Sequence, residues 1–510
     1  MIWIVVACVI VVGLVAMVIF DQFQTKHAIL KNFPIIGHFR YWLEAIGPEL
    51  RQYIVTNNDE ERPFSRDQRR WVYASAKKQN NYFGFGTDND LDGSSGYLVI
   101  KHETIPLGDS EPGHIGSGSL HAVPCVKVLG AARQRAHAFR PDSIVNISAM
   151  SFGSLSGAAI EALNRGCKIA GSLHNTGEGG ISPYHAQGGG LTWQIGTGYF
   201  GCRDDSGHFS IDLLVEQCER HNVRALEIKM SQGAKPGLGG VLPGAKVTPE
   251  IAAIRGIPVG RDCISPPSHS MFTDADSLLD FVEMLAERTG LPVGIKSAVG
   301  GTGFFEDLAG QMESGSRGVD FLTIDGGEGG TGAAPLVFSD NVSLPFRIGF
   351  PRVYRIFAER GVSDRVVFIG SGRLGFPDRA MLALALGCDM INVAREAMLA
   401  IGCIQAQRCH TGHCPTGVAT QNRWLVRGLD PTNKSHRLAN YLIMLRKDLV
   451  RLSRACGSIH PALVSLDRFE MLGGDSTSNP ASDVFNYRSG WGMPPQEAQE
   501  QLVELRITHE

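Results

Sequence analysis

In this 510-residue chain, the clearest sign of a functional site is a group of three cysteines near residue 410. Cys403, Cys409 and Cys414 form a C-x5-C-x4-C pattern, which a proline follows directly. Thiolates are soft ligands that suit iron–sulfur clusters and zinc. A structural zinc ion needs about four ligands, and the nearby His410 and His413 could complete such a set. The pattern therefore predicts a cluster or a zinc ion, with three unrelated core cysteines as the remaining possibility.

The elements that must position these residues are expected to form a parallel sheet. From about residue 140 onward, short apolar runs alternate with helical patterns, which is typical of α/β folds. The number of runs favours a closed (β/α)8 TIM barrel, with an open sheet as the alternative. Most runs end in glycine-rich or polar loops, where barrel active sites lie. The predicted strands are residues 144–150, 170–175, 224–230, 261–265, 292–296, 319–324, 366–370 and 388–394.

The first helix is expected to anchor the chain in a membrane. Residues 2–20 carry no charge, and this length spans a hydrocarbon core of roughly 30 Å. A cleavable signal peptide would have a basic start and a small-residue cleavage site, which are missing here, and a buried core helix is the other alternative. Lys26, Lys31 and Arg40 follow the apolar run, which predicts a single-pass protein of the cell membrane with a cytoplasmic catalytic domain.

Composition excludes one class of partner and agrees with a cytoplasmic domain. The formal net charge of −3 and the lack of a long basic run argue against nucleic-acid binding. Most of the 11 cysteines are isolated in apolar stretches, which is typical of reduced thiols. The expected organisation is a spanning helix at 1–20, an N-terminal layer at 21–130 packed on the barrel, the barrel at 131–430, and a C-terminal part at 431–510. This last part is expected to hold a helix, with its apolar pattern at 436–455, and a polar tail.

Several segments resemble glutamate synthases. The stretch CIQAQRCHTGHCPTGVATQ at 403–421 resembles the segment in which the same three-cysteine spacing holds a [3Fe–4S] centre. ISAMSFGSLS at 147–156, NTGEGG at 175–180, EIKMSQGAKPG at 227–237 and GGEGGTGAAP at 326–335 follow in the family's order. The resemblance covers about residues 125–430. It implies an FMN-binding barrel whose cluster is held by the cysteines at 403, 409 and 414.

The residues supply physical reasons for the FMN that the resemblance implies. Many barrels bind a phosphate between the loops after strands seven and eight, where Gly372, Arg373, Ala394 and Arg395 fall. Lys296, at the end of the fifth predicted strand, is expected beside N1 and O2 of the flavin, with a barrel carboxylate as its alternative partner. Further candidates are the segment expected to line the flavin ring, Ala149, Met150 and Ser151, and, by position, Gln194, Gly326, Gly327 and Gly330.

Three further residues are matched to substrate binding by the resemblance. Lys235 and Arg255 resemble the two cations that bind the carboxylates of 2-oxoglutarate, and Glu178 resembles a glutamate near the substrate and the cluster. We expect Glu178 and Lys296 to be the catalytic residues, with structural ion pairs as the alternative.

The chain also departs from the family near this site. Leu238 and Val241 stand where the family has a glutamate and a glutamine, and residues 265–271 read S-P-P-S-H-S-M instead of S-P-P-x-H-H-D. The resemblance therefore leaves the identity of the substrate open.

The preferred hypothesis is reductive amination. The flavin would reduce 2-iminoglutarate, formed from 2-oxoglutarate and ammonia, to L-glutamate. The sequence shows neither an N-terminal-cysteine amidotransferase domain nor a nicotinamide-binding G-x-G-x-x-G context, so free ammonia and an external donor such as ferredoxin or a separate reductase are expected. The alternatives are an oxidoreductase for another 2-oxo or N-alkyl amino acid, and a membrane-anchored electron-transfer subunit.

Overall fold

The computed structural model of the chain describes residues 2–24, 28–51, 58–91, 93–108 and 122–507. The chain divides into two compact units, Met1–Arg69 and Arg70–Glu510. The expected boundaries at residues 20, 130 and 430 remain predictions.

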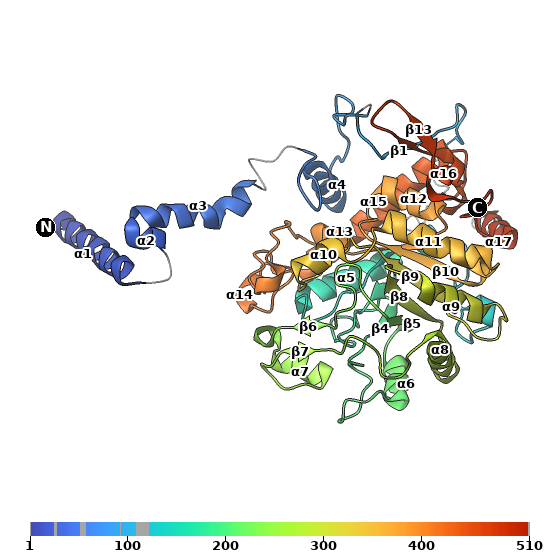
Figure 1. Ribbon diagram of the computed structural model, residues 1–510, viewed down its shortest axis with the longest axis horizontal. Coiled ribbons are helices and arrows are strands. Elements are labelled where there is room, and N and C mark those ends of the chain that lie inside the picture. The colour runs from blue at the N-terminus through green and yellow to red at the C-terminus, as the bar shows by residue number, and fades with distance from the viewer. Residues whose placement is uncertain (1, 25–27, 52–57, 92, 109–121, 508–510) are drawn as a thin grey trace. The chain divides into compact units, whose positions relative to one another are not determined.

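The second unit is built around a closed barrel, as the sequence predicts (Figure 1). Among the described residues, eight strands pair in parallel in chain order, and the last pairs with the first through Asn392 and Asn146. Most of these strands are buried along their whole length, which explains their continuous apolar runs. The barrel strands are β2 (Val145–Ile147), β3 (His174–Asn175), β4 (Leu191–Ile195), β5 (Val223–Lys229), β8 (Val293–Ala298), β9 (Phe321–Asp325), β10 (Val367–Ser371) and β11 (Met390–Val393).

One predicted barrel strand is wrong. In the run at 261–265, β7 (Cys263–Ile264) pairs antiparallel with β6 (Val241–Leu242) in a separate two-stranded sheet. The strand that completes the barrel is β4, which the sequence analysis missed. Thr192 and Gln194 interrupt the apolar run of β4, and the Gln194 amide is hydrogen-bonded to Glu227 in the barrel interior.

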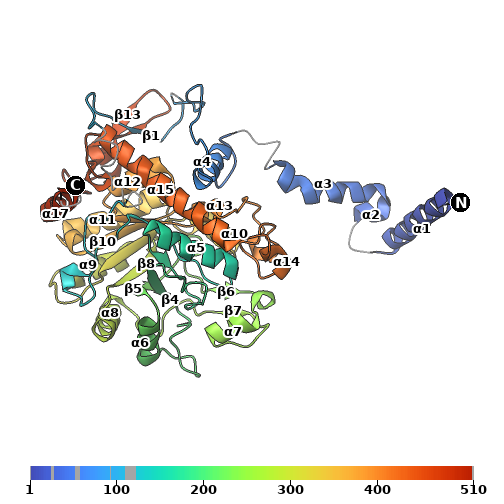
Figure 2. The ribbon, with the colours of Figure 1, turned by 180° about the vertical axis from the view of Figure 1, so that it is seen from behind.

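Helices cover the outside of the barrel (Figures 1 and 2). The connection between β3 and β4 is an exception, since residues 176–190, all of which are described, contain no helix. The helices that connect successive strands are α5 (Gly157–Ala170), α6 (Ile211–Arg220), α7 (Pro249–Arg255), α8 (Ala275–Thr289), α9 (Gly303–Met312), α10 (Leu336–Asn341), α11 (Phe346–Glu359) and α12 (Pro377–Ala385).

Local sequence signals set the ends of these helices. Asp274 and Ser277 form a reciprocal capping box at the start of α8, which satisfies backbone N–H groups that have no partner in the helix. Gly290 ends the same helix with a φ of 70°, a conformation that glycine adopts without steric cost. Ser156 begins α5 in a similar way by accepting a hydrogen bond from the Ala159 N–H.

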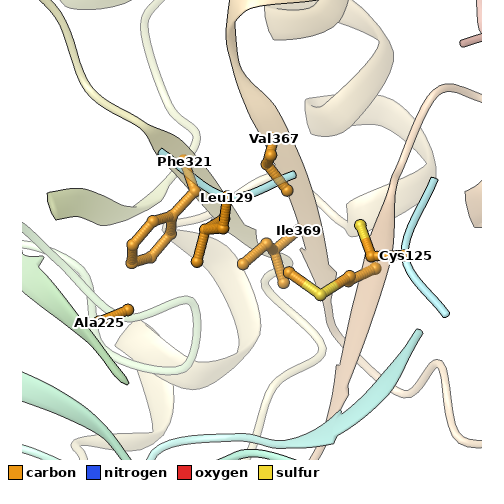
Figure 3. Packing of buried hydrophobic residues seen from close by; sticks show 7 residues of the cluster. Cys125, Leu129, Ala225, Phe321, Val367 and Ile369 are labelled. Carbon is orange, nitrogen blue, oxygen red and sulfur yellow. The ribbon is translucent and has the colours of Figure 1, made fainter. Parts of the chain in front are cut away.

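The amino end of the barrel is closed by the segment that precedes the first barrel strand. Figure 3 shows Leu129 among Ala225 of β5, Phe321 of β9, and Val367 and Ile369 of β10. All five side chains are buried. This apolar plug leaves the carboxyl ends of the strands as the open end of the barrel.

The C-terminal part adds a long helix and a small sheet. Helix α15 (Pro431–Ala455) includes the helix predicted at 436–455 and packs beside α5 (Figure 2). After it, β12 (Phe469–Leu472) pairs antiparallel with β1 (Tyr97–Ile100) and with β13 (Ser478–Pro480). The last helices are α16 (Ala481–Phe485) and α17 (Gln496–Ile507).

The first unit contains α1 (Ile2–Phe23), α2 (Ala28–Asn32) and α3 (Ile36–Leu50), and α4 (Arg66–Ala76) begins in it. In the described part of the chain, α1 is the one helix that is long and apolar enough to cross a membrane. None of its most apolar stretch is buried.

Substituting Gly166 tests the packing of α5 against α15. A Cβ atom there would lie 2.7 Å from a methyl carbon of Leu438 and 2.9 Å from the Ser435 carbonyl oxygen. Gly166→Ala should therefore lower the free energy of unfolding by roughly 1–3 kcal/mol, although alanine in a free helix is favoured over glycine by about 1 kcal/mol. Thermal unfolding would measure this, with Lys168→Ala on the exposed side of α5 as the nearly neutral control. A raised unfolding midpoint for Gly166→Ala would contradict the close crossing.

Candidate functional site

A half-buried ion pair lies at the carboxyl ends of β3 and β5. Lys229, the last residue of β5, places its Nζ 2.9 Å from Oε1 of Glu178, which follows β3. Gly196 and Gly240 flank the carboxylate, and a Cβ atom on either would lie 2.7 Å from an atom of Glu178. Burial favours a raised pKa for Glu178, but Lys229, Lys235 and Arg255 outweigh it and lower the pKa. Glu178 is therefore held as a carboxylate.

Lys235 and Arg255 bring two more positive charges to this carboxylate. Both side chains are buried. The Lys235 ammonium contacts the Gly239 carbonyl oxygen at 3.4 Å, and burial together with the charge of Lys229 lowers its pKa. Arg255 donates from Nη2 to the Phe152 carbonyl oxygen at 3.1 Å, whereas its buried Nε–H has no hydrogen-bond partner.

The charges of this group do not balance. Three cations, Lys229, Lys235 and Arg255, surround one carboxylate, that of Glu178. Among the described residues, no other carboxylate oxygen lies within 4.0 Å of the three cations. A buried charge is costly unless it is paired. The group therefore has an excess of two positive charges and an unused donor, which suits a ligand with two negative charges.

Lys296 lies on β8 and has a carboxylate partner. Its Nζ is 3.4 Å from Oδ2 of Asp325, the last residue of β9. Asp325 also accepts hydrogen bonds from the Ser371 hydroxyl at 2.7 Å and from the Gly233 N–H at 2.9 Å. The pairing is the one that the sequence analysis kept as an alternative. The role of Lys296 beside a flavin stays a prediction.

A further buried carboxylate, that of Glu227, was not predicted as functional and organises the barrel interior. Oε1 of Glu227 accepts hydrogen bonds from Asn175 Nδ2 at 2.7 Å and from Gln194 Nε2 at 2.6 Å. Its Oε2 accepts from the Thr323 hydroxyl at 2.8 Å. The amide of Gln194 is thus fixed by Glu227. Since Glu227 and Lys229 are two residues apart on β5, they share one face of the strand, and this alternation was a usable sequence signal.

The backbone after β2 is held in one position. The Met150 N–H donates to the Asn175 carbonyl oxygen at 3.1 Å, and the Met150 carbonyl oxygen accepts from Nε2 of His185 at 2.9 Å. Burial lowers the pKa of His185 to about 4, so the ring is neutral and Nε2 can carry the proton. Ala149 and Ser151 on either side are half-buried. Residues 149–151 therefore offer a fixed edge to a planar ligand.

Three arginines gather at the ends of β10 and β11. Arg373 and Arg395 were predicted, and Arg379 on α12 was not. Burial, together with the charges of Arg379 and Arg395, lowers the pKa of Arg373 to about 10. Arg373 has a left-handed φ of 53° directly after Gly372, whose φ of 137° also favours glycine. An anionic group such as a phosphate would relieve the mutual repulsion of these arginines.

The glycines of the 326–330 loop are needed for close packing. A Cβ atom on Gly330 would lie 2.6 Å from Cδ of Arg395, and one on Gly326 would lie 2.7 Å from Cβ of Phe346. The Gly327 N–H donates to the Leu344 carbonyl oxygen at 2.9 Å. Ala394 caps α13 (Arg395–Ala400), and its carbonyl oxygen accepts from the Met398 N–H at 3.0 Å.

The three predicted cysteine ligands follow α13. Cys403 and Cys409 are half-buried and Cys414 is buried. Burial would raise the pKa of Cys414, but hydrogen bonds from backbone N–H groups at residues 416, 418 and 419 and from the Thr416 hydroxyl lower it. These donors favour a thiolate, which is the form that binds metal. His410 and His413 are exposed.

Lys246 stands beside the cysteines and was not predicted. Its side chain is only 8% exposed, and its Nζ donates to the Cys409 carbonyl oxygen at 2.7 Å. In the part of the chain that the structure describes, no carboxylate oxygen lies within 4.0 Å of this ammonium group. A cluster held by three thiolates would supply the missing negative charge, so the residues present fit an iron–sulfur cluster.

One loop touches both the arginines and the cysteines. The Gly330 carbonyl oxygen accepts from Gln232 Nε2 at 3.1 Å, and the Glu328 carbonyl oxygen accepts from Arg395. A Cβ atom on Gly332 would lie 4.0 Å from Cβ of Cys409. The loop after β9 therefore links the two regions.

A cavity of about 580 Å³ opens elsewhere, beside the amino end of β5. Its lining includes Val223, Arg224 and Leu291, and none of the predicted site residues. Residues at that end of a barrel serve stability more often than catalysis.

Comparison with known proteins identifies the family. Residues 126–458 match the family described as a conserved region in glutamate synthase. The glutamate synthase large subunit-like protein YerD of Bacillus subtilis is 38% identical over 471 residues, covering 86% of this chain and 89% of that protein. An archaeal glutamate synthase [NADPH] of Methanocaldococcus jannaschii is 35% identical over 340 residues, covering 65% of this chain and 63% of that protein.

Solved structures with a similar arrangement are more distant. A flavocytochrome b2 with sulfite bound has a TM-score of 0.44 at 13% identity and covers 90% of each chain. A mandelate oxidase with an FMN adduct has a TM-score of 0.41 at 15% identity and covers 75% of this chain and 88% of its own. The assignment rests on the sequence relatives: the chain belongs to the glutamate synthase family, a family of oxidoreductases.

Proposed function

We propose that this protein reduces 2-iminoglutarate, formed from 2-oxoglutarate and ammonia, to L-glutamate with electrons from an external donor. The observation that carries the proposal is the excess of two buried positive charges around Glu178. A 2-oxo dicarboxylate brings two negative charges, so it would balance Lys235, Arg255 and Lys229 against Glu178. The unused Nε–H of Arg255 gives one carboxylate a ready donor.

Glu178 has a second task in this proposal. Its pKa is lowered by the surrounding cations despite burial, so it stays a carboxylate at neutral pH. A carboxylate accepts hydrogen bonds and can therefore orient the N–H of the imine. In the net reaction, the imine carbon gains a hydride and its nitrogen gains a proton.

The residues at the barrel mouth fit FMN. Arg373, Arg379 and Arg395 would hold its phosphate, and the segment 149–151 would lie along its ring system. Lys296, paired with Asp325, would place a positive charge beside the ring. When bound, FMN supplies the hydride that the imine carbon accepts.

The cysteines fit the second cofactor. Cys403, Cys409 and Cys414 would hold a [3Fe–4S] cluster, for which Lys246 is the buried counter-charge. Such a cluster supplies a one-electron relay. Ferredoxin or a separate reductase is the proposed electron donor.

The proposed location is the cell membrane. The 22-residue apolar helix α1 would span the bilayer and keep the barrel in the cytoplasm. Electrons could then arrive from a soluble donor or from a membrane partner.

A second candidate substrate is a less polar 2-oxo acid or an N-alkyl amino acid. Leu238, on the loop that carries Lys235, and Val241, which begins β6 directly after that loop, are exposed apolar residues. An apolar group on the substrate would pack against these two side chains.

The direct test is an assay of the purified full chain with reduced ferredoxin, 2-oxoglutarate and ammonium. We expect L-glutamate at one molecule per two electrons. Lys235→Met should raise the KM for 2-oxoglutarate by roughly 100-fold, since removing one partner of a buried charge pair costs about 3 kcal/mol. Lys235→Arg, which keeps the charge, is the matched control.

Product from N-alkyl amino acids but not from ammonium would favour the second candidate. A protein that holds FMN and iron yet forms no amino acid from any of these substrates would exclude both candidates.

The pH dependence of the rate tests the role of Glu178. Lys229→Met removes the nearest positive charge, so burial should raise the pKa of Glu178. The carboxylate would then lose its charge at a higher pH, and the acidic limb of the pH–rate profile should move up by about one unit or more. Lys229→Arg should leave the limb in place. An unmoved limb in Lys229→Met with normal FMN content would remove Glu178 from the reaction.

Charge removal at Lys246 tests the cluster. A positive charge roughly 8 Å from a redox centre, at an effective dielectric of about 20, stabilises the reduced form by on the order of 2 kcal/mol. Lys246→Gln should therefore lower the reduction potential, as measured by EPR-monitored titration, whereas Lys246→Arg should keep it. An unchanged potential with full iron content would contradict the role of Lys246 as the counter-charge.

A further inference from the structure

Helix α3 (Ile36–Leu50) carries an apolar stripe that is not covered. Ile36, Phe39 and Leu43 recur at the spacing of one helix face, and Ile46 continues the same line. Ile36 is 77% exposed and Phe39 is 60% exposed. Trp42, 56% exposed, stacks on Phe39 with the ring centroids 5.7 Å apart. Large apolar side chains in a continuous exposed stripe usually contact a partner or a membrane.

The other side of α3 carries polar residues. Arg40 forms an ion pair with Glu44, with Nη2 3.7 Å from Oε2, and its guanidinium lies 5.1 Å from the ring centroid of Tyr41. His38 also lies outside the stripe. The helix thus separates an aromatic and aliphatic side from a charged side, which is the pattern of a helix that lies at a membrane surface.

The start of α3 is tied to the end of α1. Asp21, in the last turns of α1, is completely buried. Its carboxylate contacts Nε2 of His38 at 2.9 Å and accepts a hydrogen bond from the Ile35 N–H at 3.4 Å. The first turn of α3 therefore lies at the end of α1, where a spanning helix leaves the hydrocarbon core.

We infer that α3 lies in the surface of the lipid bilayer with Ile36, Phe39, Trp42 and Leu43 inserted among the acyl chains next to the headgroups. Tryptophan and other aromatic residues favour this depth, because their rings are apolar and their edges can meet water. The Asp21–His38 contact would hold α3 across the exit of α1. The inference rests on the proposed anchoring by α1. It assigns α3 a separate function, which is to fix the anchor at the membrane surface.

The test uses the full-length protein in vesicles of phosphatidylcholine and phosphatidylglycerol whose acyl chains are brominated near the glycerol end. Bromine quenches only tryptophans that contact the chains. Trp3 lies in α1 and Trp42 in α3, so Trp3→Phe and Trp42→Phe isolate the two contributions by difference. We expect bromination to reduce the contribution of each tryptophan by about twofold.

The outcomes distinguish the anchoring by α1 from the insertion of α3 into the membrane surface. If Trp3 is quenched and Trp42 is not, the anchor stands and α3 is covered by protein, which overturns the inference. If neither is quenched, both the anchoring and the inference fail. Quenching of Trp42 that depends on protein density and not on bromine would indicate a second copy as the partner, which also overturns it.

A matched pair of variants gives an independent readout. Phe39→Glu combined with Leu43→Glu places two negative charges on the apolar stripe, whereas Ala45→Glu places one negative charge on the other side of α3. Acrylamide should quench Trp42 about twofold more strongly in the double variant than in the unchanged protein, and Ala45→Glu should have no effect. Equal acrylamide quenching in all three proteins would contradict insertion of the stripe.

Discussion

The excess of buried positive charge at the open end of the barrel is the constraint on which the site depends. Transfer of each charge from water costs several kcal/mol, and the single carboxylate of Glu178 compensates only part of it. The cations cannot move apart, because Lys229 ends a barrel strand, Lys235 is buried in the loop that follows it, and Arg255 ends helix α7. The free energy of burying these charges is therefore already part of the folded state before a ligand binds. In the proposed reaction, a dianionic ligand would recover that energy on binding, so the rigidity of the barrel would contribute to the affinity for a dicarboxylate.

Glycines make this charge density possible. Gly196 and Gly240 leave room for the Glu178 carboxylate, and a Cβ atom on Gly179 would lie 2.7 Å from Nη2 of Arg255. Backbone therefore lies directly against the charged groups at these positions, which lets them come close together. In the sequence these glycines look like turn residues, and several of them do form turns. Their second role, as space for neighbouring side chains, depends on contacts between segments that are distant in the chain.

The barrel could be predicted because most of its strands are buried and therefore read as apolar runs. β4 was missed because its run is not continuous: Gln194 is polar and donates a hydrogen bond to the buried Glu227. The family motifs point to candidate site residues, whose roles stay predictions. They do not point to Lys246, because the contact that makes it a candidate is with Cys409, 163 residues further along the chain. A lone lysine in a glycine-rich loop gives no local signal of such a partner. Sequence patterns thus predict elements and motifs, but not the charges that distant elements bring together.

The loop after β9 explains how one barrel could join two redox groups. Its Glu328 carbonyl is held by Arg395, its Gly330 carbonyl is held by Gln232, and Gly332 lies against Cys409. In the proposed enzyme the phosphate region of the flavin and the cluster ligands would thus be fixed by the same ten residues. Their separation would be set by barrel packing and not by domain movement. In the proposed enzyme, a separate electron donor would need to reach only the exposed surface beside His410.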